Sequence, residues 1–153
     1  MHFPVVTGSN LLRQELTLPR DLGGELNIVL IAFQRWQQAE VDTWLPWAEQ
    51  LERTHAGVRA YELPTIQRLN RLVQAFIDGG MRAGIPDPVA RERTITLYVD
   101  KGAFRRALDL PNEDAIYVLL LDRAGQVLGR AAGVYTPEKG EALARAIAGP
   151  VEP

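Results

Sequence analysis

The sequence predicts an α/β fold in which one mixed β-sheet is flanked by helices. Two runs, Asn27–Phe33 and Ala115–Leu121, are almost entirely apolar, as expected of strands that are covered on both faces. Apolar residues between and beyond these runs recur three and four positions apart, which is the spacing of one helix face. Strand and helix signals that alternate along one chain favour a sheet with helices packed on it.

The chain before the first buried strand carries little pattern. Residues 1–15 are expected to form an N-terminal arm, and residues 16–153 a single domain. Leu16–Leu18, followed by Pro19, predicts a short strand closed by a turn. No internal repeat, low-complexity tract or linker divides the rest of the sequence.

Beyond the first buried strand, the spacing of apolar residues predicts a helix from Val41 that ends before Gly57. Pro46 lies near the start of this helix, where a missing backbone donor costs little. The next strand is predicted over Val58–Leu63. The apolar face of the helix consists of Val41, Trp44, Leu45, Ala48 and Leu51.

A second helix is predicted after Thr65, which is a suitable N-cap residue. Gly79–Gly80 is expected to end this helix by adopting positive φ angles. The following segment, Met81–Pro88, contains two prolines and predicts a loop. The apolar side of the helix consists of Ile66, Leu69, Val73, Phe76 and Ile77.

The last third of the chain predicts Thr94–Val99 as a strand, because it is rich in β-branched and aromatic residues. Asp100 is expected to cap a short helix before the second buried strand. Asp122–Gly125 predicts a tight turn into an antiparallel strand over Val127–Ala132. Thr136 then caps a last helix that continues through Ile147. The predicted order is β-α-β-α-β-α-β-β-α.

This order, with its two most apolar strands before the polar loop and before the last hairpin, resembles the thioredoxin-like fold. The strings TITLYVDKGAFRRALDL and YVLLLDRAGQVLGRAAG are similar to the peroxiredoxin and thiol-reductase branch. In redox members a proline lies five residues after the second cysteine of a Cys-X-X-Cys pair. Counting back from Pro46 places that pair at Gln38–Val41, and the expected cis-proline falls near Ile116. The resemblance therefore implies a redox scaffold that has lost its thiol site.

A narrower resemblance concerns the mitochondrial ATP synthase assembly-factor family, a thioredoxin-like group without the dithiol. It rests on the strings TWLPW and MRAGIPDP, and on IYVLLLD followed by a glycine turn. The resemblance implies a role that does not depend on cysteine.

Composition excludes several classes of function. The sequence has no cysteine, which rules out disulfides, thiolate metal sites and thiol nucleophiles. A net charge of −2 argues against a nucleic-acid binder, which needs a basic surface. No apolar run approaches the length of a membrane span, and no signal-peptide pattern is present, so a cytoplasmic location is expected.

The segment in the position of the dithiol is the candidate binding site. We expect Trp36, Gln38, Glu40, Val41, Trp44 and Ile116 to form it. Tryptophan is common at interface hot spots, and amide side chains suit recognition better than proton transfer. Two alternatives remain at this point: Trp44 is a core residue on the buried helix face, and Glu40 is a solvated carboxylate.

Outside that segment, Arg82 beside two glycines is a possible anion contact. The two histidines, His2 and His55, have no partner at metal-ligand spacing, so we expect neither a metal nor a cofactor. The leading hypothesis is a non-redox adaptor or assembly factor whose partner is another protein or peptide. An enzyme that uses Glu40 or Arg82, and a small-ligand carrier, are the alternatives.

Overall fold

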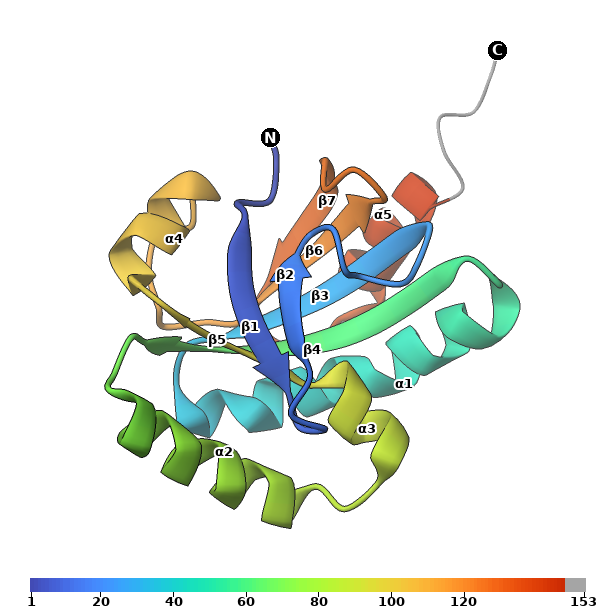
Figure 1. Ribbon diagram of the computed structural model, residues 1–153. Coiled ribbons are helices and arrows are strands. Elements are labelled where there is room, and N and C mark those ends of the chain that lie inside the picture. Colours follow the sequence, from blue (N-terminus) through green and yellow to red (C-terminus); the bar gives the residue numbers. More distant parts are fainter. Residues whose placement is uncertain (148–153) are drawn as a thin grey trace.

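The computed structural model describes residues 1–147, which form a seven-stranded mixed sheet in the order β2-β1-β5-β4-β3-β6-β7, with helices on both faces (Figure 1). The strands are β1 (Val6–Asn10), β2 (Glu15–Leu18), β3 (Leu26–Ala32), β4 (Val58–Gln67), β5 (Ile95–Val99), β6 (Tyr117–Asp122) and β7 (Val127–Ala132). The helices are the 3-10 turn η1 (Arg35–Gln37), α1 (Gln38–Thr54), α2 (Arg71–Gly84), α3 (Pro88–Arg93), α4 (Lys101–Ala107) and α5 (Pro137–Ile147). The predicted mixed sheet with flanking helices is confirmed.

The two apolar runs form the centre of the sheet. β3 pairs with β6 in antiparallel register, with Ile28 opposite Leu120, and with β4 in parallel register. Successive residues of β3 enter opposite cores: Val29 and Ile31 join one hydrophobic cluster, while Ile28 and Leu30 join the other. Both clusters exist because strands β3 and β6 are apolar on both sides.

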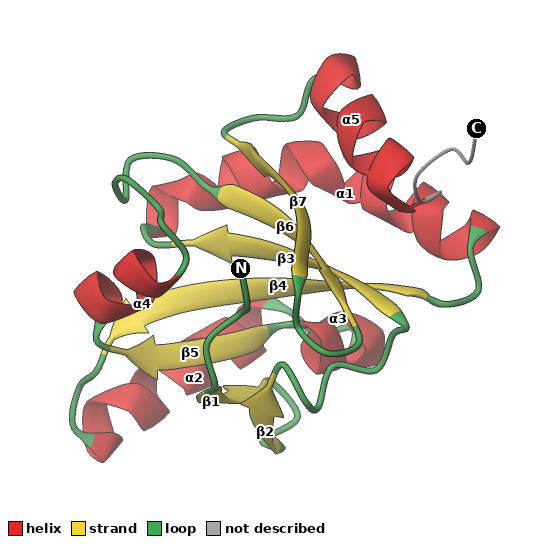
Figure 2. Cartoon of the chain, turned by 90° about the horizontal axis from the view of Figure 1, so that it is seen from above, coloured by secondary structure: helices red, strands yellow, loops and turns green. Residues whose placement is uncertain are grey.

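Each cluster is covered by its own elements (Figure 2). α1 and α5 pack on one face through Trp44 and Leu143. On the other face lie α4, through Phe104, and the N-terminal segment, through Phe3. Helices α2 and α3 lie on the same side of the sheet as α1 (Figure 1).

The expectation of an N-terminal arm over residues 1–15 needs correction. Val6–Asn10 is β1, which pairs with both β2 and β5 inside the sheet. Phe3 is 2% exposed and contacts Phe104 edge to face, with ring centroids 5.7 Å apart. Strand β1 has the sequence VTGSN, so its place is set by pairing with its neighbours and not by an apolar pattern.

The boundaries of the second helix also differ from the prediction. Thr65 lies in β4, because the end of that strand pairs with β5 and places Thr65 opposite Leu97. The helix begins five residues later, where the Asn70 side chain accepts a hydrogen bond from the Val73 N–H group at 3.0 Å. Tertiary pairing thus extends the strand past the predicted N-cap.

Gly79 and Gly80 do not end α2, which continues through them to Gly84. Neither glycine has a positive φ angle. The predicted loop Met81–Pro88 therefore contains the last turn of α2, a short connection and the start of α3, which Asp87 caps by accepting from the Ala90 N–H group.

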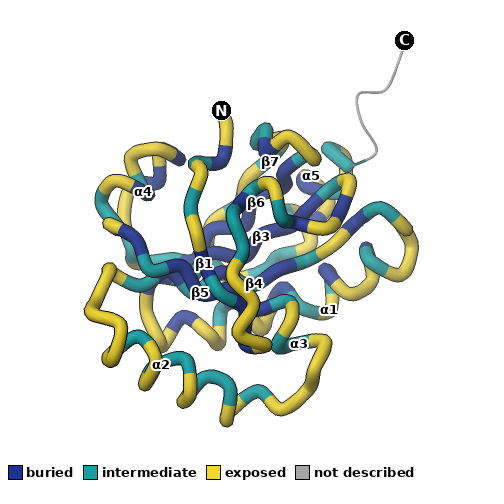
Figure 3. Tube along the Cα trace, viewed as in Figure 1, coloured by how far each residue is buried: buried dark blue, intermediate teal, exposed yellow. Residues whose placement is uncertain are grey.

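Hydrogen bonds join helix α2 to strand β5. The Tyr98 hydroxyl of β5 donates to Asp78 Oδ1 at 2.8 Å and also lies 3.1 Å from the Gln74 carbonyl oxygen. Burial, together with the bond to Asp78, raises the pKa of Tyr98. The side chains of Leu72 and Phe76 are 85% and 83% exposed, and no residue of α2 is buried (Figure 3). Of the predicted apolar side, Phe76 is exposed, Ile77 is half-buried and Ile66 lies in β4. The helix therefore buries none of its side chains in the core.

Replacement of Gly79 or Gly80 by alanine should stabilise α2, because an added Cβ atom at either position meets no atom of the described residues within 4 Å. Alanine is favoured over glycine in a helix interior by about 1 kcal/mol. Amide hydrogen exchange of α2 in Gly79→Ala and Gly80→Ala should therefore slow. Unchanged or faster exchange would contradict the expected gain in helix stability. Gly140→Ala is the contrasting control, since its Cβ atom would lie 2.7 Å from Tyr135 Cε2.

Candidate functional site

Gln38 lies at the N-terminus of α1, the position that the sequence resemblance assigns to the first cysteine of a dithiol. It follows η1 as the first residue of α1, close to the end of β3. Its Nε2 group donates to Asp42 Oδ1 at 2.9 Å and to Glu62 Oε1 at 3.0 Å. The helix N-terminus, which lowers the pKa of a thiol in a redox protein, here carries an amide held between two carboxylates.

Glu62 is the perturbed acid of this site. Burial raises the pKa of its carboxyl group, the hydrogen bond from Gln38 lowers it, and the nearby charge of Asp42 raises it again. Burial is the largest of the three causes, so the charged form of Glu62 is destabilised in the fold.

The structure divides the predicted site residues into a surface group and a core group. Val41 is 1% exposed, and both Trp44 and Ile116 are 0% exposed; all three belong to the cluster beneath α1. Their expected role in a binding surface is therefore corrected, because side chains so deeply buried cannot touch a partner. The core interpretation of Trp44 is supported by its Nε1 group, which donates to the Gly133 carbonyl oxygen at 2.9 Å.

The surface group consists of Trp36, Gln38 and Glu40. Trp36 is 60% exposed although it is a large aromatic residue. Glu40, in the first turn of α1, is half-buried, and its Oε1 atom has no hydrogen-bond partner among the described residues. These three side chains are the part of the predicted site that a partner can reach.

Gln37 is a structural residue of this site that sequence reasoning missed. It is fully buried, and its Oε1 atom accepts hydrogen bonds from the N–H groups of Phe33 and Gln34 at 2.8 and 3.1 Å. Its Nε2 group donates to the Glu113 carbonyl oxygen at 2.7 Å. One side chain thus joins the loop after β3 to the segment before β6. No sequence signal separates Gln37 from its glutamine neighbours.

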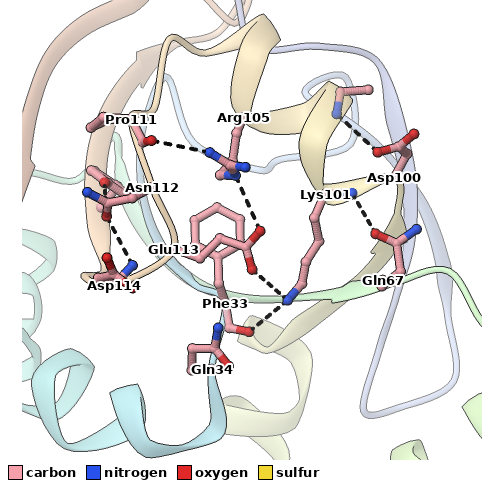
Figure 4. Close-up of polar contacts among 12 residues, drawn as sticks. Phe33, Gln34, Gln67, Asp100, Lys101, Arg105, Pro111, Asn112, Glu113 and Asp114 are labelled. Carbon is pink, nitrogen blue, oxygen red and sulfur yellow. Dashed lines mark hydrogen bonds and ion pairs between the residues drawn. The ribbon is translucent and has the colours of Figure 1, made fainter.

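Ion pairs to Glu113 also connect the loop after β3 with the segment before β6 (Figure 4). Lys101 Nζ lies 2.8 Å from Glu113 Oε1 and 3.3 Å from the Phe33 carbonyl oxygen. Arg105 Nε forms an ion pair with the other carboxylate oxygen of Glu113 at 3.3 Å. The end of β3, the start of α4 and the segment before β6 are therefore held together by polar contacts.

Arg82 is not brought to this site. It lies in the last turn of α2, where its carbonyl oxygen accepts from the Arg91 guanidinium group at 2.9 Å. Within residues 1–147, no hydrogen bond or ion pair joins Arg82 to Trp36, Gln38 or Glu40. An anion contact by Arg82 stays a prediction.

A groove beside the site lies between α1, β4 and α3, with Glu62 among its lining residues. Its volume is about 210 Å³, below the range of about 300–1,000 Å³ that is usual for small-molecule sites. In the groove wall, Glu52 forms an ion pair with Arg93, whose guanidinium group lies 5.4 Å from the centre of the Tyr61 ring.

Within residues 1–147, no group of three or more histidine, cysteine or acidic side chains is placed to hold a metal ion. None of the helices that the structure describes has the length and apolarity that a bilayer crossing requires.

Substitution of Gln37 should destabilise the protein. In Gln37→Ala the buried N–H group of Phe33 and the Glu113 carbonyl group lose their partners, which costs about 2–3 kcal/mol of unfolding free energy. Gln50→Ala, at an exposed position of α1, is the matched control and should change stability little. Chemical denaturation measures both variants. Equal stability of Gln37→Ala and the wild type would show that this link is not structural.

The raised pKa of Glu62 predicts that the stability of the fold depends on pH. The unfolded carboxyl group titrates near its ordinary value of 4.5, whereas in the fold its pKa is raised. Stability should therefore fall as pH rises through that interval, because the folded state binds the proton more tightly. Glu62→Gln should melt at a higher temperature than the wild type at pH 7, and this gain should shrink below pH 4.5. Glu49→Gln is the control. A gain in Glu62→Gln that does not change with pH would contradict this account.

Comparisons with known proteins extend the fold assignment. No family model matches the sequence, and no curated protein matches it. Among solved structures, it is similar to the pneumococcal exposed lipoprotein thioredoxin Etrx1 from Streptococcus pneumoniae, with 12% identity, a TM-score of 0.58 and coverage of 95% of this chain and 99% of that one.

Two further solved structures resemble this chain. A thiol:disulfide interchange protein from Bacteroides sp. has 14% identity and a TM-score of 0.63 over 99% of this chain and 91% of its own. BsSco, a member of the Sco family of cytochrome c oxidase assembly proteins, has 11% identity and a TM-score of 0.63 over 96% and 92%. Identities this low show the fold alone. The protein thus has the thioredoxin-like fold of these neighbours, and its sequence contains no cysteine.

Proposed function

We propose that this protein binds another protein or peptide and does so without thiol chemistry. The observation that carries the proposal is that the 38–41 segment presents an amide group and no thiol. Gln38 stands at the N-terminus of α1 where redox relatives keep a thiolate, and its amide group is already bonded to Asp42 and Glu62. An amide in this position can hold a partner by hydrogen bonds but cannot attack a disulfide.

The exposed tryptophan next to this segment supports the proposal. Trp36 leaves 60% of its surface in solvent, two residues before Gln38. Tryptophan is enriched among residues that dominate binding energy at protein interfaces, because it buries a large apolar area with few rotatable bonds. A partner that covers Trp36 would also reach Gln38 and Glu40.

The support beneath this surface is rigid. Gln37 joins the loop after β3 to the segment before β6, and Lys101 bonds to both sides of the same junction. The loop that carries Trp36 should therefore lose little conformational entropy when a partner binds, which favours recognition by a preformed surface.

A role in the assembly of a larger complex belongs to this proposal. One structural neighbour, BsSco, is a member of a family of assembly proteins with this fold. The resemblance to the ATP synthase assembly-factor family and the cytoplasmic location remain predictions.

An enzyme is the second candidate, and Glu62 is the observation that favours it. A buried carboxyl group with a raised pKa is a common property of acid–base sites. The groove at Glu62, at about 210 Å³, is small for a substrate pocket. This candidate, like a small-ligand carrier, therefore has less support than partner binding.

Trp36→Ala should strongly reduce capture of a specific partner. The immobilised full chain is exposed to extract from the native host, and bound proteins are identified by mass spectrometry. Loss of a central tryptophan typically costs about 2 kcal/mol or more, so the captured amount should fall roughly tenfold or more. Gln38→Ala should weaken capture less.

The control variant is Val5→Ala, at an apolar residue that is 79% exposed outside this site. It should retain capture, and the melting temperature of Trp36→Ala should equal that of the wild type. If no partner is enriched, or if Trp36→Ala retains it fully, the proposal fails.

A further inference from the structure

A second hollow lies between the start of α2 and the β1–β2 hairpin, and three arginines line it. Arg13 comes from the hairpin turn, Arg68 is the residue after the end of β4, and Arg71 is the first residue of α2. The hollow has a volume of about 420 Å³, within the usual range of about 300–1,000 Å³ for small-molecule sites.

Most of the positive charge in this hollow is not neutralised by acidic side chains. Among the described residues, none of these three guanidinium groups takes part in an ion pair. Among residues 1–147, Glu15 is the one carboxylate in the lining. The whole chain carries a net charge of −2, so three arginines against one acid is a local excess of positive charge. Such an excess attracts anions.

The turn that carries Arg13 is held in an unusual conformation. Arg13 has a φ angle of 64°, in the left-handed region that non-glycine residues rarely adopt. Asn10, which is 4% exposed, enforces it by accepting hydrogen bonds from the N–H groups of Leu12 and Gln14, each at 3.0 Å. Arg13 is thus fixed at the rim of the hollow.

The other two arginines are also fixed at their backbones. The Arg68 N–H group donates to the Val99 carbonyl oxygen at 2.9 Å. Arg71 follows the capping residue Asn70, which accepts from the Val73 N–H group. Because the three Cα positions are set in advance, an anion that binds here needs to order only side chains.

The rest of the lining suits a phosphate ligand. Thr7 and Ser9 of β1 add two hydroxyl groups, and Leu69 adds an apolar contact. Guanidinium groups bind phosphate oxygens in pairs through parallel N–H donors. We infer that this hollow binds a small phosphate-bearing anion of the diphosphate class, which includes nucleoside diphosphates. Three cations around one hollow favour such a compact anion over an extended acidic peptide. This site does not depend on partner binding at Trp36.

Calorimetric titration of the full chain with pyrophosphate tests the inference, at an ionic strength of about 20 mM so that surface charges are little screened. One pyrophosphate should bind per chain. Each of Arg13→Gln, Arg68→Gln and Arg71→Gln should weaken binding by about fivefold, since each removes a charged contact of about 1 kcal/mol. The triple variant should show no binding. Circular dichroism should show unchanged folding, because all three side chains are exposed.

Arg53→Gln and Arg123→Gln are the matched controls, since they remove the same charge from exposed positions on α1 and in the β6–β7 turn. Both should bind pyrophosphate as the wild type does. The inference is overturned if the wild type does not bind, or if the controls lose as much affinity as the three hollow variants. Tighter binding of a glutamate-rich peptide than of pyrophosphate, through the same arginines, would also overturn it and would indicate an acidic protein partner.

Discussion

The antiparallel pairing of β3 and β6 is the constraint on which the rest of this structure depends. Both strands are buried on both faces, so each supplies side chains to two separate cores. Those cores require a cover on each side of the sheet, which α1 and α5 provide on one face and α4 with the N-terminal segment on the other. Because burial of apolar area is the main favourable term in folding, the position of every helix that packs on these strands follows from the pair.

A polar junction at one end of these strands fixes the geometry of the candidate site. Gln37, Lys101 and Glu113 connect the loop after β3 with the segment before β6. The sequence resemblance assigns the dithiol and the cis-proline of a redox protein to these same two segments. In this chain the corresponding residues are Gln38–Val41 and Ile116, and Ile116 packs in the core. Trp36 and Gln38 are exposed at this end of the strands, and Glu40 is half-buried there.

The second helix shows how local pattern and tertiary contact can disagree. Its apolar residues Leu72 and Phe76 point to solvent, whereas Gln74 and Asp78 meet Tyr98 of β5. Hydrogen bonds to a half-buried tyrosine thus fix the rotation of α2 against the sheet. The same placement sets the start of α2 beside β1 and gathers arginines from three segments around one hollow. Neither feature arises from any single stretch of sequence.

The sequence by itself determined the central strands, the hairpin after Asp122, the short helix capped by Asp100 and the absence of cysteine. These features rest on local properties: continuous apolar runs, turn residues, capping side chains and composition. Only the tertiary structure decided that Thr65 belongs to β4, that residues 6–10 complete the sheet, that Trp44 and Ile116 are core, and that Gln37 joins two distant segments. These outcomes depend on strand pairing and on burial between residues far apart in the chain. Contacts of this kind produce no periodic pattern in the sequence around any of these residues.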